Sequence, residues 1–220
     1  MGAQLIRNVR RLPLVSSPAP SLAFFDLGGV VARFLPERRL PALAALGSTS
    51  AARLHEAIWE SGLSREFDGG QYSATAMHSK LCELLGTHVP VNSVAAAWCL
   101  AFEAVPEVLA VVRSLRSCVP VGLLSNNPPL LREALSRYLP EVASAFSPIL
   151  FSCELGALKP EAALFERAAQ RLGVASNQLL LIDDSTANVT GARRAGWQAI
   201  HFKSVPDLER NLSALGLEAA

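Results

Sequence analysis

The sequence has no long apolar run and almost no excess of charge of either sign. A membrane-spanning helix needs roughly 20 consecutive apolar residues, and no segment approaches that length. The formal net charge of the 220 residues is +1, so there is no overall field to attract nucleic acid or a membrane surface. We therefore expect neither a membrane span nor a nucleic-acid partner.

Cysteine is also scarce, and its spacing does not suit a metal site. There is no C-x-x-C pair, and the four cysteines are widely separated: Cys82, Cys99, Cys118 and Cys153. Small secreted domains that depend on disulfides are shorter and richer in cysteine. We expect four reduced thiols in a cytoplasmic protein.

Acidic residues are absent from the first 21 residues, where arginine, serine and proline recur. This composition predicts a flexible N-terminal tail over residues 1–21. It also suits an organellar targeting segment, which stays open as an alternative. The segment has no continuous apolar stretch, which argues against a secretory signal.

The rest of the chain has the composition of a folded protein, with 50% hydrophobic and 18% charged residues. Residues 22–27, LAFFDL, predict a buried parallel strand. Residues 36–103 then show apolar positions at helical spacing, polar helix starts and closing glycines. This pattern predicts a small helical cap over residues 35–103, inserted directly after the first strand.

Beyond the cap, predicted strands and helices alternate. Four apolar segments read as strands, each followed by a helix: VPVGLLSNN, SPILFS, NQLLLIDD and WQAIHFK. Such alternation predicts an α/β fold, a doubly wound parallel sheet with helices on both faces. The core of this fold would comprise residues 22–34 and 104–220.

Polar side chains occur where these predicted strands end, the edge at which such sheets bind ligands. Asp26 ends the first strand, and Lys159 begins the helix after the third. The other strand ends carry Ser125 with Asn126, and Asp183 with Asp184. Gathering three carboxylates is costly unless they hold a cation, so this edge predicts a site for a hard divalent ion such as Mg²⁺.

The residues after Asp26 suggest what such an ion would serve. Gly28 and Gly29 have no side chains, so backbone N–H groups could approach an anion there. Asp26 would attack a phosphate ester and form an aspartyl-phosphate, while Mg²⁺ and Lys159 stabilise the phosphoryl oxygens. Taken singly, each motif is explained as well by a turn or a helix cap. Their joint placement at successive strand ends favours catalysis.

The order of motifs resembles the haloacid dehalogenase (HAD) superfamily, most of whose members are phosphatases with an aspartate nucleophile. The four motifs are FDLGGV, LLSNN, LKPE and LIDDSTANVTGA. The resemblance extends over residues 22–214 and is strongest to sugar-phosphate phosphatases of the glucose-1-phosphatase type. It implies a Rossmann-like HAD core with a helical cap, Mg²⁺ as cofactor and a small phosphorylated metabolite as substrate.

The resemblance also implies roles for the metal site. Asp26 would be both nucleophile and metal ligand, and the backbone carbonyl of Gly28 would be a second ligand. Asp184 would be the main metal-binding acid, with Asp183 supporting the metal directly or through water. Asn188 stands where many relatives have another acid. The loss of that negative charge would weaken metal binding slightly.

For the substrate, the resemblance assigns the phosphoryl oxygens to Ser125 and Asn126. Lys159 would pair with the phosphate and with Asp26. Gly29, together with the neighbouring Gly28, would leave room for the phosphate.

One departure from the family pattern concerns proton transfer. Most of the family's phosphatases have a second aspartate two residues after the nucleophile, where this chain has Gly28. General acid–base catalysis contributes a factor of about 10²–10⁴ in rate. A good leaving group, ordered water, or a cap residue such as His55 or His78 would have to compensate. The glucose-1-phosphatase-like relatives share this glycine.

Two other functions remain open at this stage. A haloacid dehalogenase would use Asp26 without a metal, although the acids at 183–184 then have no purpose. A non-catalytic relative that binds a partner or a phosphorylated ligand would explain Gly28, but not the retained acids. In the cap, residues 65–73 predict a turn facing the site. Four aromatic residues could line the pocket: Trp59, Phe67, Tyr72 and Trp98.

Overall fold

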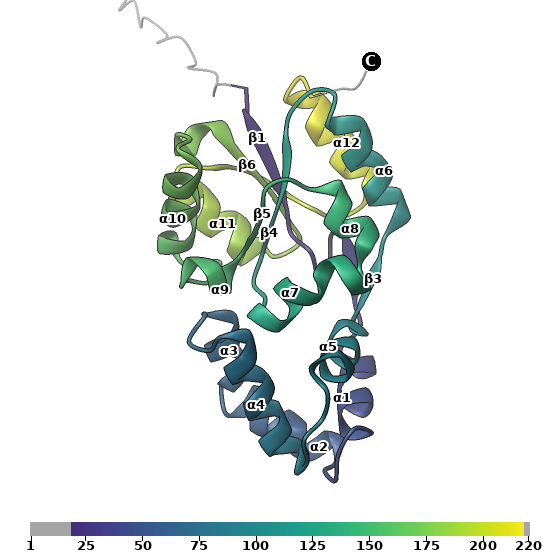
Figure 1. The fold of residues 1–220 in the computed structure, drawn as a ribbon. Coiled ribbons are helices and arrows are strands. Elements are labelled where there is room, and N and C mark those ends of the chain that lie inside the picture. The colour runs from purple at the N-terminus through teal and green to yellow at the C-terminus, as the bar shows by residue number, and fades with distance from the viewer. Residues whose placement is uncertain (1–18, 218–220) are drawn as a thin grey trace, which may run out of the picture.

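A computed structural model describes residues 19–217 and shows a five-stranded parallel sheet in the order β5-β4-β1-β6-β7 (Figure 1). The strands are β1 (Leu22–Phe25), β4 (Val121–Ser125), β5 (Ile149–Phe151), β6 (Leu179–Asp183) and β7 (Gln198–His201). Helices cover both faces, so the predicted fold class is confirmed. The predicted tail lies outside the described residues, except for residues 19–21.

The central strand β1 shows why the sheet is covered on both faces. All four of its residues are buried, and they alternate between two apolar layers. Ala23 and Phe25 face one layer and Leu22 and Phe24 the other. The first layer includes α6 (Pro106–Leu115), α8 (Pro140–Ala145) and α12 (Val205–Ala214). The second includes α10 (Ala162–Leu172) and α11 (Thr186–Arg194), beside α9 (Ser152–Leu155).

The insertion after the first strand is helical, as predicted, and its helices lie together at one end of the molecule (Figure 1). We call these helices the cap. They are α1 (Pro36–Ala44), α2 (Ala51–His55), the π-helical η1 (Glu56–Glu60), α3 (Leu63–Asp68), α4 (Ala74–Leu85) and α5 (Val91–Cys99). The predicted turn at 65–73 is partly wrong, because α3 continues to Asp68.

A short antiparallel ribbon connects the cap to the sheet. It pairs β2 (Ala32–Phe34) with β3 (Phe102–Ala104). Sequence patterns did not predict these strands, since three residues are too few to show an alternation. Between cap and sheet lies α7 (Pro129–Tyr138), which begins after Pro128 and packs against α4 and α5.

Local capping sets the limits of several helices. The Ser73 hydroxyl accepts a hydrogen bond from the N–H of Ala76 at the start of α4, and Gly86 closes that helix with a φ of +71°. At the start of α11, Ser185 accepts from the N–H of Asn188. Among residues 19–217, no helix has both the length and the apolarity that crossing a membrane requires.

Candidate active site

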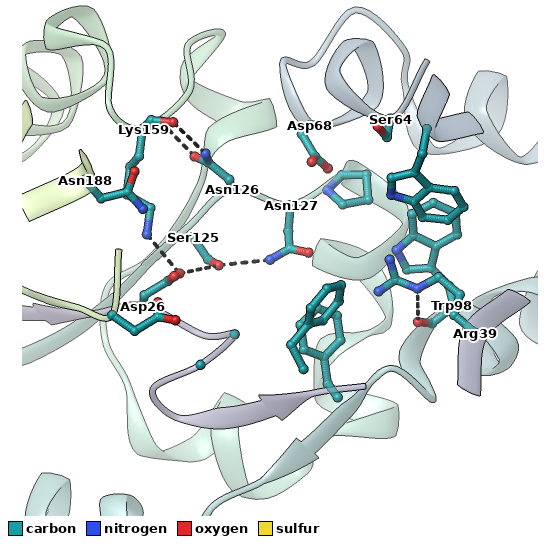
Figure 2. Close-up of a pocket in the computed structure, with 17 residues that line it drawn as sticks. Asp26, Arg39, Ser64, Asp68, Trp98, Ser125, Asn126, Asn127, Lys159 and Asn188 are labelled. Atoms are coloured by element: carbon teal, nitrogen blue, oxygen red, sulfur yellow. Dashed lines mark hydrogen bonds and ion pairs between the residues drawn. The ribbon is translucent and has the colours of Figure 1, made fainter. Parts of the chain in front are cut away.

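The ends of three neighbouring strands bring the predicted residues together. Asp26 follows β1, Ser125 ends β4 and Asp183 ends β6, and β1 lies between the other two strands. Lys159 reaches the same place from the segment between α9 and α10. Figure 2 shows Asp26, Ser125 and Lys159 on one side of a cavity.

Lys159 is the centre of this group. Its ammonium lies 2.9 Å from Asp26 Oδ1 and 2.6 Å from Asp183 Oδ2, and it donates to the Leu124 carbonyl at 3.0 Å. The side chain is 1% exposed. Burial alone would lower the pKa of this amine, but the two carboxylates outweigh burial and raise it. Lys159 therefore remains a cation that ties Asp26 to Asp183.

The carboxylate of Asp26 is held by one of its oxygens. Oδ1 accepts hydrogen bonds from the backbone N–H of Leu27 and from the Ser125 hydroxyl, both at 2.7 Å, and it also contacts Lys159. Among the described residues, all three of these groups contact Oδ1 rather than Oδ2. Oδ2 is thus the oxygen left to approach a phosphorus atom or a cation.

The two adjacent acids have different surroundings. Asp183 is fully buried, and both its oxygens are engaged: Oδ1 accepts from the Ser185 N–H at 2.9 Å, and Oδ2 meets Lys159. The Asn188 amide donates to both oxygens, at 3.0 and 3.1 Å. Asp184 instead is exposed and lines the cavity. Asp183 thus positions Lys159, and Asp184 is the acid available to a ligand.

The charges of this end of the cavity fit a divalent cation. Oxygens of Asp26, Asp183 and Asp184 lie within 4.8 Å of one another, and Lys159 offsets only one of the three negative charges. Burial, and the charge of Asp183, raise the pKa of both Asp26 and Asp184. A bound Mg²⁺ would favour their ionised forms.

The two asparagines after Ser125 have structural tasks. The Asn126 amide donates to the Lys159 carbonyl and accepts from the Lys159 N–H, both at 2.9 Å. Its side chain thus fixes the backbone of Lys159, whereas the prediction gave it to the phosphate. Asn127, which the sequence analysis missed, donates to the Ser125 hydroxyl at 2.9 Å. The signal was available, since residues i and i+2 of an extended segment share a side.

Gly28 and Gly29 differ in what they allow. A Cβ on Gly29 would lie 2.2 Å from Asp184 Oδ2, and its φ is +78°, so this glycine is required for the approach of Asp184. The Gly29 N–H donates to the Ala32 carbonyl at 2.8 Å, which contradicts its predicted contact with an anion. A Cβ on Gly28 would meet only ordinary contacts at 3.6 Å, to Phe34 and Phe102.

The cavity has a volume of about 420 Å³ and joins the core to the cap. Arg39, Ser64 and Asp68 line its cap end (Figure 2). The predicted aromatic residues Trp59 and Trp98 also line it, and their rings stack with centroids 5.9 Å apart. The other two aromatic candidates do not line the cavity and instead belong to the apolar core or pack against it: Phe67 and Tyr72.

Neither histidine proposed as a proton donor lines the cavity. His78 is half-buried in the cap, with Nε2 2.7 Å from the Val89 carbonyl oxygen. His55 is exposed and lies 3.6 Å from Glu60. This alternative for the proton donor therefore has no support from either histidine.

Comparisons with known proteins find relatives that match most of this chain. D-ribitol-5-phosphate phosphatase from Bacteroides thetaiotaomicron is 26% identical over 200 residues, 87% of this chain and 96% of that protein. The structure of a HAD-like hydrolase from Porphyromonas gingivalis has a TM-score of 0.73 and 27% identity, covering 88% of this chain and 98% of that one.

A HAD family enzyme from B. thetaiotaomicron, solved with magnesium and inorganic phosphate, shares the fold. Its TM-score is 0.72 at 23% identity, over 84% of this chain and 94% of that one. A comparison with protein families matches residues 20–196 to the haloacid dehalogenase-like hydrolases. This match confirms the predicted family and the prediction of a hydrolytic enzyme. The chain belongs to the haloacid dehalogenase-like hydrolase family.

Proposed function

We propose that the protein is a Mg²⁺-dependent phosphatase for a small phosphorylated metabolite, a sugar or polyol phosphate. The observation that carries this proposal is the position of Lys159 between Asp26 and Asp183, which leaves Asp26 Oδ2 for a substrate. The 26% identical relative is named for a polyol phosphate, and a structural neighbour holds magnesium and phosphate. Both agree with the proposed activity.

The proposed reaction has two displacements at phosphorus. In the first, Asp26 Oδ2 attacks the phosphorus, the ester P–O bond breaks, and the alcohol leaves with a proton taken from water, which becomes hydroxide. In the second, a water attacks the aspartyl-phosphate and gives a proton to that hydroxide, the acyl phosphate P–O bond breaks, and Asp26 is regenerated with release of inorganic phosphate. We assign this proton to water because position 28 has no side chain, neither histidine lines the cavity, and Asp68 lies across the cavity from Asp26.

The residues of the core end divide the remaining work. Lys159 holds Asp26 in place and offers positive charge to the phosphoryl oxygens, and the Ser125 hydroxyl lies beside the same carboxylate. Asp26 and Asp184, with the Gly28 carbonyl, would hold Mg²⁺. When bound, the ion supplies charge that neutralises the phosphate and favours attack by an anion.

The test is turnover of p-nitrophenyl phosphate by the wild type, Asp26→Asn and a control, Asp207→Asn, whose residue lies on α12. We expect Mg²⁺-dependent hydrolysis by the wild type and the control, and loss of this hydrolysis when a chelator removes the metal. The Asp26→Asn variant should show no hydrolysis. Hydrolysis by Asp26→Asn would exclude the covalent mechanism. Metal-independent halide release from a 2-haloacid would favour the dehalogenase. Binding of Mg²⁺ and phosphate without any turnover would favour the non-catalytic relative.

A further inference from the structure

The cap end of the cavity contains two opposite charges that do not pair with each other. Arg39 comes from α1 and Asp68 is the last residue of α3, and both line the cavity. Figure 2 shows them across the cavity from Asp26 and Lys159. Within residues 19–217, no ion pair joins Arg39 to Asp68. A ligand group can therefore contact both.

Arg39 is buried with part of its hydrogen-bonding capacity unused. It is 4% exposed, Nε donates to the Trp98 carbonyl at 2.9 Å, and its guanidinium carbon lies 4.4 Å from the Trp98 ring centroid. Nη2 is buried and finds no acceptor among the described residues. Burial lowers the Arg39 pKa from 12.5 to about 10, so the side chain stays charged at neutral pH. An unsatisfied charged donor is costly, and a bound acceptor would remove that cost.

Asp68 is held in place by its backbone rather than by its carboxyl group. Its carbonyl accepts a hydrogen bond from the Ser152 hydroxyl at 2.6 Å, and this hydroxyl accepts from the Asn127 N–H at 3.0 Å. The bridge connects the end of α3 to the loop after Ser125. Burial raises the Asp68 pKa from 3.8 to about 7, and Arg39 limits the rise. The carboxyl group would gain from a ligand that donates a hydrogen bond.

We propose that Arg39 and Asp68 bind hydroxyl groups at the end of the substrate remote from the phosphate, and so select polyol and sugar phosphates. This inference rests on the proposed phosphatase function. A hydroxyl group can donate to the Asp68 carboxyl and accept from Arg39, and two adjacent hydroxyls can satisfy both residues. Beside them the half-buried ring of Trp59, which stacks on the buried Trp98, offers an apolar surface to the C–H groups of a carbon chain.

Other ligand groups fit this end less well. A second anion would be attracted by Arg39 but repelled by the carboxylate of Asp68. An ammonium group would be attracted by Asp68 but repelled by Arg39. An alkyl chain would leave both buried polar groups without partners. Sites built to hydrogen-bond a hydroxyl reject analogues that lack it far more strongly than apolar pockets reject an added group.

The test compares three substrates on Arg39→Met and Asp68→Ala. Ribitol 5-phosphate carries the hydroxyls, pentyl phosphate has a similar chain and leaving group without them, and p-nitrophenyl phosphate needs no proton on leaving. We expect kcat/KM for ribitol 5-phosphate to fall about 10- to 100-fold in each variant. The two other substrates should change less than about threefold. Two matched controls leave the cavity untouched: Arg38→Met, next to Arg39 on α1, and Glu66→Ala on α3.

Any other outcome of this test would contradict the inference. Equal losses on all three substrates would mean that Arg39 and Asp68 only maintain the fold. A loss on both alkyl substrates but not on p-nitrophenyl phosphate, in Asp68→Ala, would make Asp68 a proton donor instead. A wild type that hydrolyses p-nitrophenyl phosphate but shows no preference for ribitol 5-phosphate over pentyl phosphate would overturn the inference and leave the phosphatase function intact.

Binding decides the inference even if the phosphatase function fails. Titration of the wild type with the same two five-carbon phosphates should show tighter binding of ribitol 5-phosphate. Arg39→Met should abolish that difference. Equal affinities in the wild type would refute the inference without any use of turnover.

Discussion

At the core end of the cavity the buried charges are bonded to one another, whereas at the cap end they are not. Lys159 contacts Asp26 and Asp183, and Asp183 receives further hydrogen bonds from Asn188. Arg39 and Asp68 share a cavity wall without an ion pair between them. The buried charges of the core end thus have partners before a substrate arrives, whereas under our proposal those of the cap end gain theirs from the substrate.

This difference suits a hydrolase that applies one reaction to a chosen substrate. A preorganised group lowers the barrier because its charges do not have to reorient during the reaction. Unsatisfied groups lower stability in the free protein and recover that energy only with a ligand that supplies the right partners. Under our proposal, chemistry and selection would lie in different parts of the chain, the sheet edge and the cap.

The largest effect should come from breaking the core end. Lys159→Met leaves Asp26 and Asp183 buried without their common cation. We expect a loss of about 3–5 kcal/mol in the free energy of unfolding. We also expect a loss of about 10²–10³ or more in kcat. Urea unfolding and p-nitrophenyl phosphate turnover measure both, with the exposed Lys203→Met as control. Near-normal stability in Lys159→Met would show that the buried pairs are not what holds this end together.

A smaller effect should separate the two glycines beside the nucleophile. Gly29→Ala would place a Cβ against the Asp184 carboxylate and force alanine into a left-handed backbone conformation. We expect the Mg²⁺ concentration for half-maximal activity to rise about 10- to 100-fold. Gly28→Ala, whose Cβ meets ordinary contacts, is the matched control and should change it less than about threefold. Similar results for both variants would refute the role given to Gly29.

The smallest effect concerns the cap end and depends on pH. The folded protein holds a proton on Asp68 up to about pH 7, whereas the unfolded chain loses it near 3.8. Asp68 therefore lowers the free energy of unfolding as pH rises from about 4 to 7, and its cost is constant above that range. Asp68→Asn should be more stable than the wild type at pH 8, with little difference near pH 4. Urea unfolding of both proteins across this range is the measurement, and a pH-independent difference would contradict the prediction.

The core end was predictable because each of its residues stands at a position marked by the sequence. Asp26, Ser125 and Asp183 each follow an apolar strand, and parallel strands end at one edge. The distribution of tasks within this group was not predictable. Sequence patterns place Asn126 near the phosphate, but cannot show that its amide is engaged by the backbone of Lys159.

The cap end was not predictable in the same way. Arg39 lies within RRLPAL, where an arginine on an amphipathic helix is expected to face water. Arg39 is buried because α1 packs against α5 and the Arg39 guanidinium lies over Trp98. The two residues are 59 positions apart, so no local pattern shows this contact. Asp68 lies in the segment predicted to face the site, although as the end of a helix rather than within a turn.

The paired strands β2 and β3 have a consequence for how such a protein can diversify. Because they pair with each other, the chain enters and leaves the cap at a single place. Everything between Phe34 and Phe102 can be exchanged for another insert without interrupting one ladder of the main sheet. A new cap would have to fit α7, α9 and the loop after Ser125, while the strand ends that carry Asp26, Ser125 and Asp183 keep their positions.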